Sequence, residues 1–386
     1  MPVYLDNAAS TCVHPAVVEA MLPYFREHFG NPSSHHAAGV SVRDTVEAAR
    51  ELIARAVNAE PDELLFTSGG TEADHLAIVG TSLLTPANRR HVIVSAIEHQ
   101  AVLRAAEQLS KNGFSLTVLN PDSDGIIQPD DVAAAIRPDT FLVSVMAVNN
   151  EVGTIQPLEK ISAVLKPRGI LFHSDAVQAF GKIHLDVRKL GVDLLSLSAH
   201  KLHGPKGVGA LFVRRGVRLK AVLPGGGQEH GLRSGTENVP AIAGFAKAVE
   251  IATANLDKAS AKARKLRDKL ESAILAELPG TKLATSSKNR SPYIANILFP
   301  MVDNSYLLNR LDAAGVYVTS GSACASHSLE PSHVLVAMGV SENLARSAIR
   351  FSLSNFTTEE EINCAVRTAV EIVEPFVTEL AAESTP

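Results

Sequence analysis

The sequence predicts an α/β fold in which a mostly parallel sheet is flanked by helices and followed by a smaller α+β domain. Short apolar runs alternate with stretches of helical spacing between about residue 60 and residue 215. These runs are almost continuously apolar, as is typical of parallel strands that are buried on both faces. A change of composition after Gly225-Gly226-Gly227 marks the end of this region.

The strands of the sheet are predicted from the apolar runs, and the helices from apolar positions that recur every three to four residues. The predicted strands are residues 64–66, 92–95, 116–119, 141–148, 170–172, 194–197 and 209–213, all of them buried. The predicted helices are residues 14–27 and 42–57, which precede the sheet, and residues 100–111 and 158–167, which lie between strands.

The last third of the chain predicts a separate domain. Residues 240–277 form a long helical stretch, rich in alanine, lysine and glutamate, that could bridge two domains. Strands at 294–299 and 349–353 then mix with helices at 305–314 and 359–380. We expect a large domain at 16–260, a small C-terminal domain at 261–386, and an N-terminal segment at 1–15 that joins the small domain.

The composition excludes several classes of protein. The 36 basic and 41 acidic residues are spread along the 386 residues, without the basic excess of a nucleic-acid-binding protein. No apolar run approaches the length of a membrane span, and the N-terminus lacks the pattern of a signal peptide. Cys12, Cys324 and Cys364 are too few and too scattered for a disulfide framework or a CxxC metal site. We therefore expect a cytoplasmic protein without nucleic-acid or membrane partners.

Polar residues that directly follow the apolar runs are candidates for function, because open α/β sheets bind ligands at the carboxyl ends of their strands. The turn Ser68-Gly69-Gly70-Thr71 leads from a strand into a helix. Its glycines would let an anion approach the free N–H groups of the helix N-terminus, although a plain turn fits the pattern equally well. Asp175 also follows a strand, where it is either a helix N-cap or a buried acid that needs a partner.

Lys201 and Cys324 carry more specific signals. Lys201 directly follows an apolar run and lies next to Ser198 and His200. Partial desolvation there would lower the pKa of the lysine and make its amine a nucleophile that forms Schiff bases. Cys324 lies among serine, glycine and alanine, without the apolar neighbours that surround a structural cysteine. An accessible polar loop of this kind favours a reactive thiolate.

Histidines suggest a ring contact more than a metal. His99 follows a predicted strand, where its imidazole could stack on a ring or titrate near neutral pH. The pairs His35-His36 and His200/His203 have no third or fourth ligand at a supporting spacing. No metal site is predicted.

Together these segments resemble the pyridoxal-phosphate cysteine desulfurases, in particular the NifS/IscS-like branch of the class V aminotransferase family. The matching motifs are Tyr4-Leu5-Asp6-Asn7-Ala8-Ala9, Gly30-Asn31-Pro32-Ser33-Ser34, Asn149-Asn150-Glu151-Val152-Gly153, Ser198-Ala199-His200-Lys201, Arg233-Ser234-Gly235-Thr236 and Ile349-Arg350-Phe351-Ser352-Leu353. Ser320-Gly321-Ser322-Ala323-Cys324 is similar to the long mobile cysteine loop of this branch. The resemblance implies the pyridoxal-phosphate fold type I, with the cofactor in the large domain and the cysteine loop in the small one.

The resemblance also implies how the cofactor, pyridoxal 5'-phosphate, is bound. Lys201 would form the Schiff base and transfer protons, and Asp175 would pair with the pyridinium nitrogen. Gln178 would donate a hydrogen bond to the phenolate oxygen, and His99 would stack on the ring as a catalytic residue. The phosphate would be held by Gly70, Thr71, Ser198 and His200, and by Thr236 from a second subunit, which implies a homodimer.

The implied reaction converts L-cysteine to L-alanine. Asn150 and Arg350 would bind the substrate carboxylate, a task suited to the planar guanidinium group. Cys324 would attack the substrate sulfur and carry it as a persulfide to an acceptor or an iron–sulfur scaffold protein, with at most a transient iron–sulfur contact during transfer. The alternatives are a selenocysteine lyase, another class V pyridoxal-phosphate enzyme, or a catalytically silent binding subunit. The segment Gly70-Thr71-Glu72-Ala73-Asp74-His75 departs from the Ala-Thr-Glu-Ser-Asn-Asn that is common in the branch.

Overall fold

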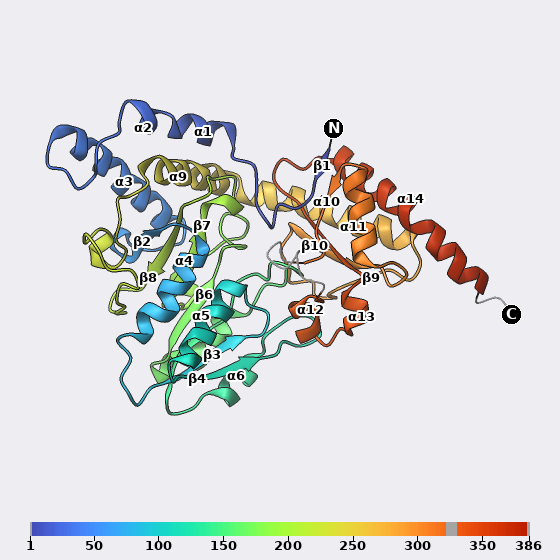
Figure 1. Cartoon of the computed structure of the whole chain (residues 1–386), viewed down its shortest axis with the longest axis horizontal. Coiled ribbons are helices and arrows are strands. Elements are labelled where there is room, and N and C mark those ends of the chain that lie inside the picture. Colours follow the sequence, from blue (N-terminus) through green and yellow to red (C-terminus); the bar gives the residue numbers. More distant parts are fainter. Residues whose placement is uncertain (1, 322–329, 384–386) are drawn as a thin grey trace.

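The structure is a computed structural model that describes residues 2–321 and 330–383 (Figure 1). Its main sheet has seven strands in the order β2-β8-β7-β6-β5-β3-β4. The strands are β2 (Leu64–Thr67), β3 (His91–Ser95), β4 (Ser115–Leu119), β5 (Thr140–Ser144), β6 (Leu171–Asp175), β7 (Leu194–Ser198) and β8 (Gly209–Val213). In this sheet β8 alone runs opposite to the other six strands, so the predicted mostly parallel sheet is confirmed.

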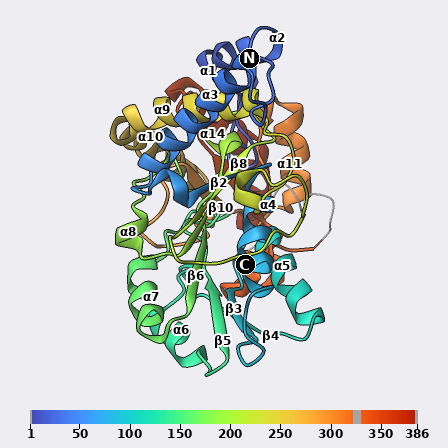
Figure 2. The ribbon, with the colours of Figure 1, turned by 90° about the vertical axis from the view of Figure 1, so that its left-hand side faces the viewer.

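Helices cover both faces of this sheet, as Figure 2 shows for α4 and α5 on one side and α6, α7 and α8 on the other. Side chains alternate between the faces along each strand. Phe66 and Leu195 enter a core with α3 and α9, whereas Leu65 and Leu194 enter a core with α4 and α5.

The helices of this part are α1 (Pro15–Met21), α2 (Pro23–Arg26), α3 (Ala37–Arg55), α4 (Gly70–His75), α5 (Gln100–Lys111), α6 (Pro129–Ala135), α7 (Leu158–Leu165), α8 (Val187–Leu190) and α9 (Val239–Ala254). Short helical turns are η1 (Pro61–Glu63), η2 (Leu76–Gly80, a π-helix), η3 (Lys166–Arg168), η4 (Ala199–Lys201) and η5 (Glu229–Gly231).

The C-terminal part has its own three-stranded antiparallel sheet, in the order β12-β10-β9, and its own apolar core. Its elements are α10 (Leu256–Glu277), β9 (Lys282–Leu283), β10 (Ile294–Leu298), α11 (Asn304–Ala313), β11 (Val316–Tyr317), α12 (His333–Ala337), α13 (Glu342–Ala345), β12 (Ala348–Ser352) and α14 (Glu359–Glu383). The N-terminal strand β1 (Val3–Tyr4) pairs in parallel with β11, and Asp6 forms a bridge with Ser352. The N-terminal segment therefore packs against the C-terminal part of the chain.

Several predicted elements need correction. The predicted helix 14–27 is broken at Pro23, which begins α2, because proline has no backbone N–H to continue the helical ladder. The predicted stretch 240–277 is two helices that meet at Asn255. The predicted strand 141–148 ends at Ser144, and Val148 instead forms a bridge with Ile155 across a turn. Strand β4 lies at the sheet edge and is half-exposed rather than buried.

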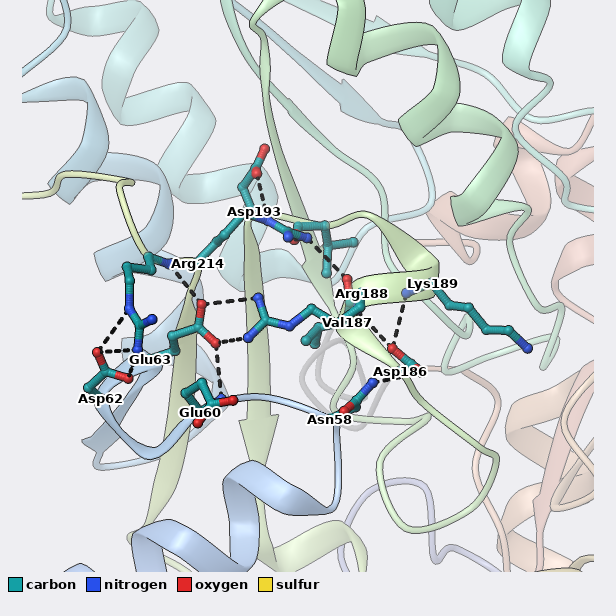
Figure 3. Close-up of polar contacts among 12 residues, drawn as sticks. Asn58, Glu60, Asp62, Glu63, Asp186, Val187, Arg188, Lys189, Asp193 and Arg214 are labelled. Atoms are coloured by element: carbon teal, nitrogen blue, oxygen red, sulfur yellow. Dashed lines mark hydrogen bonds and ion pairs between the residues drawn. The ribbon is translucent and has the colours of Figure 1, made fainter.

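A polar cluster fastens the start of β2 to α8 (Figure 3). The buried carboxylate of Glu63 forms an ion pair with Arg188. Asp186 caps α8 by accepting from the N–H of Arg188 at 2.8 Å, and it also accepts from the side chain of Asn58 at 3.0 Å. Arg214 donates from Nε and Nη2 to the carbonyl oxygen of Val192, which follows α8, at 3.1 and 2.6 Å. Among the described residues, no helix has the length and hydropathy needed to cross a membrane.

Candidate active site

A cavity of about 250 Å³ lies at the carboxyl ends of β6 and β7. This is the edge where a parallel sheet binds its ligands. The cavity is lined by Ala8, Ala9, Gly70, Thr71, Asp74, His99, Met146, Asn150, Asp175, Val177, Gln178, Ser198, His200, Lys201 and Arg350. Every predicted site residue is in this set except Thr236 and Cys324.

Asp175 ends strand β6 and faces the cavity from the centre of the sheet. Its Oδ1 accepts from the N–H of Val177 at 2.8 Å, and residues 176–186 form turns and loops, so it is not a helix N-cap. Burial raises the pKa of the Asp175 carboxyl, whereas the nearby side chains of His99 and Lys201 oppose this shift. A cationic N–H group in the cavity would stabilise the ionised form of this buried acid.

His99 is the N-cap of α5, and its Nδ1 accepts from the N–H of Ala101 at 3.2 Å. The proton of the neutral ring is therefore on Nε2. Burial lowers the pKa of His99, which keeps the ring neutral near pH 7. A neutral, capped imidazole has a fixed orientation and offers a flat face to a ligand.

The N-terminal segment holds the amine of Lys201 at the cavity. Lys201 ends η4, directly after β7, and its Nζ donates to the carbonyl oxygens of Ala8 and Ala9, each at 2.6 Å. The Nε2 of Gln178 donates to the same Ala8 oxygen at 2.8 Å. The lysine amine and the glutamine amide therefore lie side by side at the cavity.

One end of the cavity suits an anion. Gly70 and Thr71 begin α4, whose first N–H groups have no helical partners. A Cβ at Gly70 would lie 2.7 Å from Cγ2 of Val177, so only glycine lets the backbone pass here. Among the described residues, the buried hydroxyl of Ser198 has no hydrogen-bond partner. Burial lowers the pKa of His200 to about 4, so its ring is neutral. Unused donors and a glycine cradle fit a phosphate group.

The cavity is also lined by a buried arginine. Arg350 lies in β12, donates from Nη1 to the carbonyl oxygen of Asn150 at 2.9 Å, and from Nη2 to Oδ1 of Asp6 at 2.7 Å. Its Nε is buried and has no partner among the described residues. A guanidinium group held at two nitrogens, with an unused third, suits a carboxylate ligand.

The two remaining predicted residues are not at the cavity of this chain. Thr236 lies between η5 and α9, is exposed, and does not line the cavity. Cys324 lies outside the described residues. Cys12 and Cys364 do not line the cavity either.

The sequence reasoning missed Asp74, a buried acid on α4. Its Oδ1 lies 3.5 Å from Nε2 of His173 and has no hydrogen-bond partner among the described residues. Burial and the charge of Asp175 raise the pKa of Asp74 well above its ordinary value. The departure from the family pattern at this position was the available signal.

Asp74, His99 and Asp175 bring three metal-ligand types together, with ligand atoms all within 4.8 Å of one another. However, His99 already uses Nδ1 at the helix cap, and burial favours the protonated form of both carboxyl groups. Metal ligands must be deprotonated. The absence of a metal stays a prediction.

Comparisons with known proteins identify the family of the chain. A family model described as aminotransferase class-V matches residues 3–364. A protein from Dictyoglomus turgidum named cysteine desulfurase IscS is 45% identical over 372 residues, 96% of this chain and 94% of that protein. One of the same name from Methanosarcina thermophila is 45% identical over 96% of this chain and 92% of that protein. A solved structure named NifS-like protein has a TM-score of 0.91 and 41% identity, and the match covers 97% of this chain and all of that chain. The chain therefore has the pyridoxal-phosphate fold type I and belongs to the class-V aminotransferase family.

Proposed function

We propose that the chain is a pyridoxal-phosphate-dependent cysteine desulfurase that converts L-cysteine to L-alanine and passes the sulfur to an acceptor protein. The observation that carries this proposal is the single cavity that unites Asp175, His99, Lys201 and Arg350. The full-length similarity to proteins named cysteine desulfurase supports the choice of substrate.

Different cavity residues would contact different parts of the cofactor. Asp175 would face the ring nitrogen, His99 the ring, and Gln178 the phenolate oxygen. The phosphate would lie against Gly70, Thr71, Ser198 and His200, where the unused donors are. When bound, pyridoxal phosphate supplies an electron sink for negative charge at the substrate Cα.

The protein supplies substrate binding and proton transfer. Arg350 and Asn150 would hold the substrate carboxylate, because Nε of Arg350 is an unused buried donor. The amine of Lys201 would bind the cofactor and move protons, since the carbonyl oxygens of Ala8 and Ala9 hold it at the cavity. These contacts would orient the substrate Cα for deprotonation.

The sulfur step is assigned to Cys324. Its thiolate would form a bond to the substrate sulfur while the carbon–sulfur bond breaks, and the substrate carbon would take up a proton. One thiol and one molecule of cysteine thus give one persulfide and one molecule of alanine. The persulfide then passes to an acceptor, such as an iron–sulfur scaffold protein.

We also propose a cytoplasmic homodimer. Leu22, Phe25 and Phe29 lie on or next to α2 and are 44%, 60% and 78% exposed. An exposed apolar group of this kind is typical of a protein interface. Thr236 is also exposed, so it is free to reach a site on a second copy.

Reconstitution tests the cofactor assignment. The purified chain should bind pyridoxal phosphate with visible absorption, and Lys201→Ala should lose turnover of L-cysteine while keeping its circular-dichroism spectrum. Alanine formation by Lys201→Ala at the wild-type rate would contradict the assignment.

A further inference from the structure

Lys182 is a buried lysine next to the cavity. It lies in the turns after β6 and is 7% exposed. Its Nζ donates to Oε1 of Gln178 at 2.9 Å and lies 6.0 Å from the ring centre of Tyr293. The charged groups that act on it are Lys201 and Arg350, both cations. A buried ammonium group in this setting is costly, and its hydrogen bond to Gln178 offsets part of that cost.

The hydrogen bonds of Gln178 determine which way its amide group faces. An ammonium group can only donate, so the amide atom facing Lys182 must be the oxygen. A carbonyl oxygen can only accept, so the amide atom facing Ala8 must be the nitrogen, at 2.8 Å. The two contacts therefore fix the positions of both the amide oxygen and the amide nitrogen of Gln178.

We propose that Lys182 is a positioning residue that holds the Gln178 amide with its nitrogen toward the cavity, so that it donates to an acceptor oxygen of the bound ligand. This inference rests on the proposed function, in which that oxygen is the phenolate of pyridoxal phosphate. Lys182 itself does not line the cavity and acts through Gln178.

The electrostatic surroundings agree with this role. Burial, together with Lys201 and Arg350, lowers the pKa of Lys182 to about 7. An anionic ligand in the cavity would oppose this shift and favour the charged, donor-only form. The hydrogen bond from Lys182 to Gln178 is therefore strongest when the ligand is bound.

A purely structural role for Lys182 is the competing explanation. The hydroxyl of Ser260 donates to the backbone oxygen of Lys182 at 2.7 Å, and this contact ties the turn to α10 without using the lysine side chain. A double-mutant cycle separates the explanations. If Lys182 acts through Gln178, replacing Lys182 should not weaken cofactor binding further once the Gln178 side chain is truncated.

The test measures the dissociation constant of pyridoxal phosphate by titrating the apoprotein, for the wild type, Lys182→Met, Gln178→Ala and the double variant. Each single variant should bind about tenfold more weakly, as expected for one lost hydrogen bond to a charged group. The double variant should match Gln178→Ala within about twofold. The exposed Lys189→Met on α8 is the matched control and should bind like the wild type.

An unchanged dissociation constant in Lys182→Met, or losses that multiply in the double variant, would overturn the inference. Thermal unfolding of each apoprotein checks that it is folded. If Lys182→Met does not fold, Gln178→Glu decides, because its carboxylate keeps Lys182 as a partner but has no hydrogen to donate. Gln178→Glu should bind at least about tenfold more weakly, and wild-type affinity would overturn the inference. A wild-type chain that binds no pyridoxal phosphate would instead contradict the proposed function.

Discussion

At the scale of single residues, buried carboxyl groups around the cavity set how the protein responds to pH. Glu98 precedes His99, and its Oε1 accepts from the N–H of Met146 at 2.7 Å and from the hydroxyl of Ser95. Its Oε2 is buried and has no partner among the described residues. Burial raises the pKa of Glu98 to about 8, so this carboxyl group is protonated near neutral pH.

Glu98→Gln should therefore remove a pH-dependent loss of stability. The folded pKa of about 8 lies above the ordinary value of 4.5. Between these values the native state binds the extra proton, and the free energy of unfolding falls as pH rises. Glutamine imitates the protonated acid and does not titrate. The difference in thermal midpoint, variant minus wild type, should increase as the pH is raised from about 5 to about 8. A difference that is independent of pH would contradict this account.

Arg350→Lys should raise KM for L-cysteine at least about tenfold, with a smaller change in kcat, because an ammonium group cannot reproduce the planar contacts of a guanidinium group. Steady-state kinetics measure both parameters. Unchanged kinetics would mean that another residue binds the carboxylate. Arg233 is less suited to this task, because its Nε already donates to Glu72 at 2.9 Å.

At the scale of elements, apolar runs predicted the strands of the main sheet because all of its strands except the edge strand β4 are buried between two helical layers. The antiparallel direction of β8 could not be predicted, since its apolar run Gly209–Val213 is the same in either direction. The burial of Glu98 and Lys182 was also missed. A single charged residue beside a turn has the same local pattern whether it is buried or exposed, and only the packing of distant elements decides between them.

An ion pair fastens α10 to the segment that precedes β10. Both guanidinium nitrogens Nη1 and Nη2 of Arg290 lie 2.5 Å from the carboxylate oxygens of Glu271, and the side chains are 9% and 6% exposed. Arg290→Met should destabilise the protein by roughly 3–5 kcal/mol, because it leaves a buried charge unpaired.

Chemical denaturation measures this loss, with Arg104→Met as the control. Arg104 pairs with Glu107 on the surface of α5 and its side chain is 71% exposed. Its replacement should change the free energy of unfolding by at most about 1 kcal/mol. Equal losses for Arg290→Met and Arg104→Met would refute the role given to the buried pair.

At the scale of the whole molecule, the cavity joins parts that are distant in sequence. Asp6 and Arg350 connect the N-terminal segment to β12, while Ala8 receives the amine of Lys201. We propose that the domains divide at 1–15, 16–260 and 261–386. The motifs predicted which residues line the cavity, whereas the contacts between them depend on how these parts pack.

The proposed homodimer predicts a mass of twice the 40.9 kDa of one chain in sedimentation experiments. Phe25→Glu should shift the equilibrium toward the monomer and weaken retention of pyridoxal phosphate, because a charge would be buried at the interface. Val118→Glu on the edge strand β4, far from α2 in Figure 1, is the matched control and should stay dimeric. A fully active wild-type monomer would rule out a shared site.

The most direct test of the central claim is to incubate the holoprotein with L-cysteine and a reductant, and to measure alanine and sulfide in the same samples. A cysteine desulfurase that transfers sulfur through Cys324 should release both products in equal amounts, and Cys324→Ala should bind the cofactor but release no sulfide. Alanine without an equal amount of sulfide, or full sulfide release by Cys324→Ala, would contradict the account.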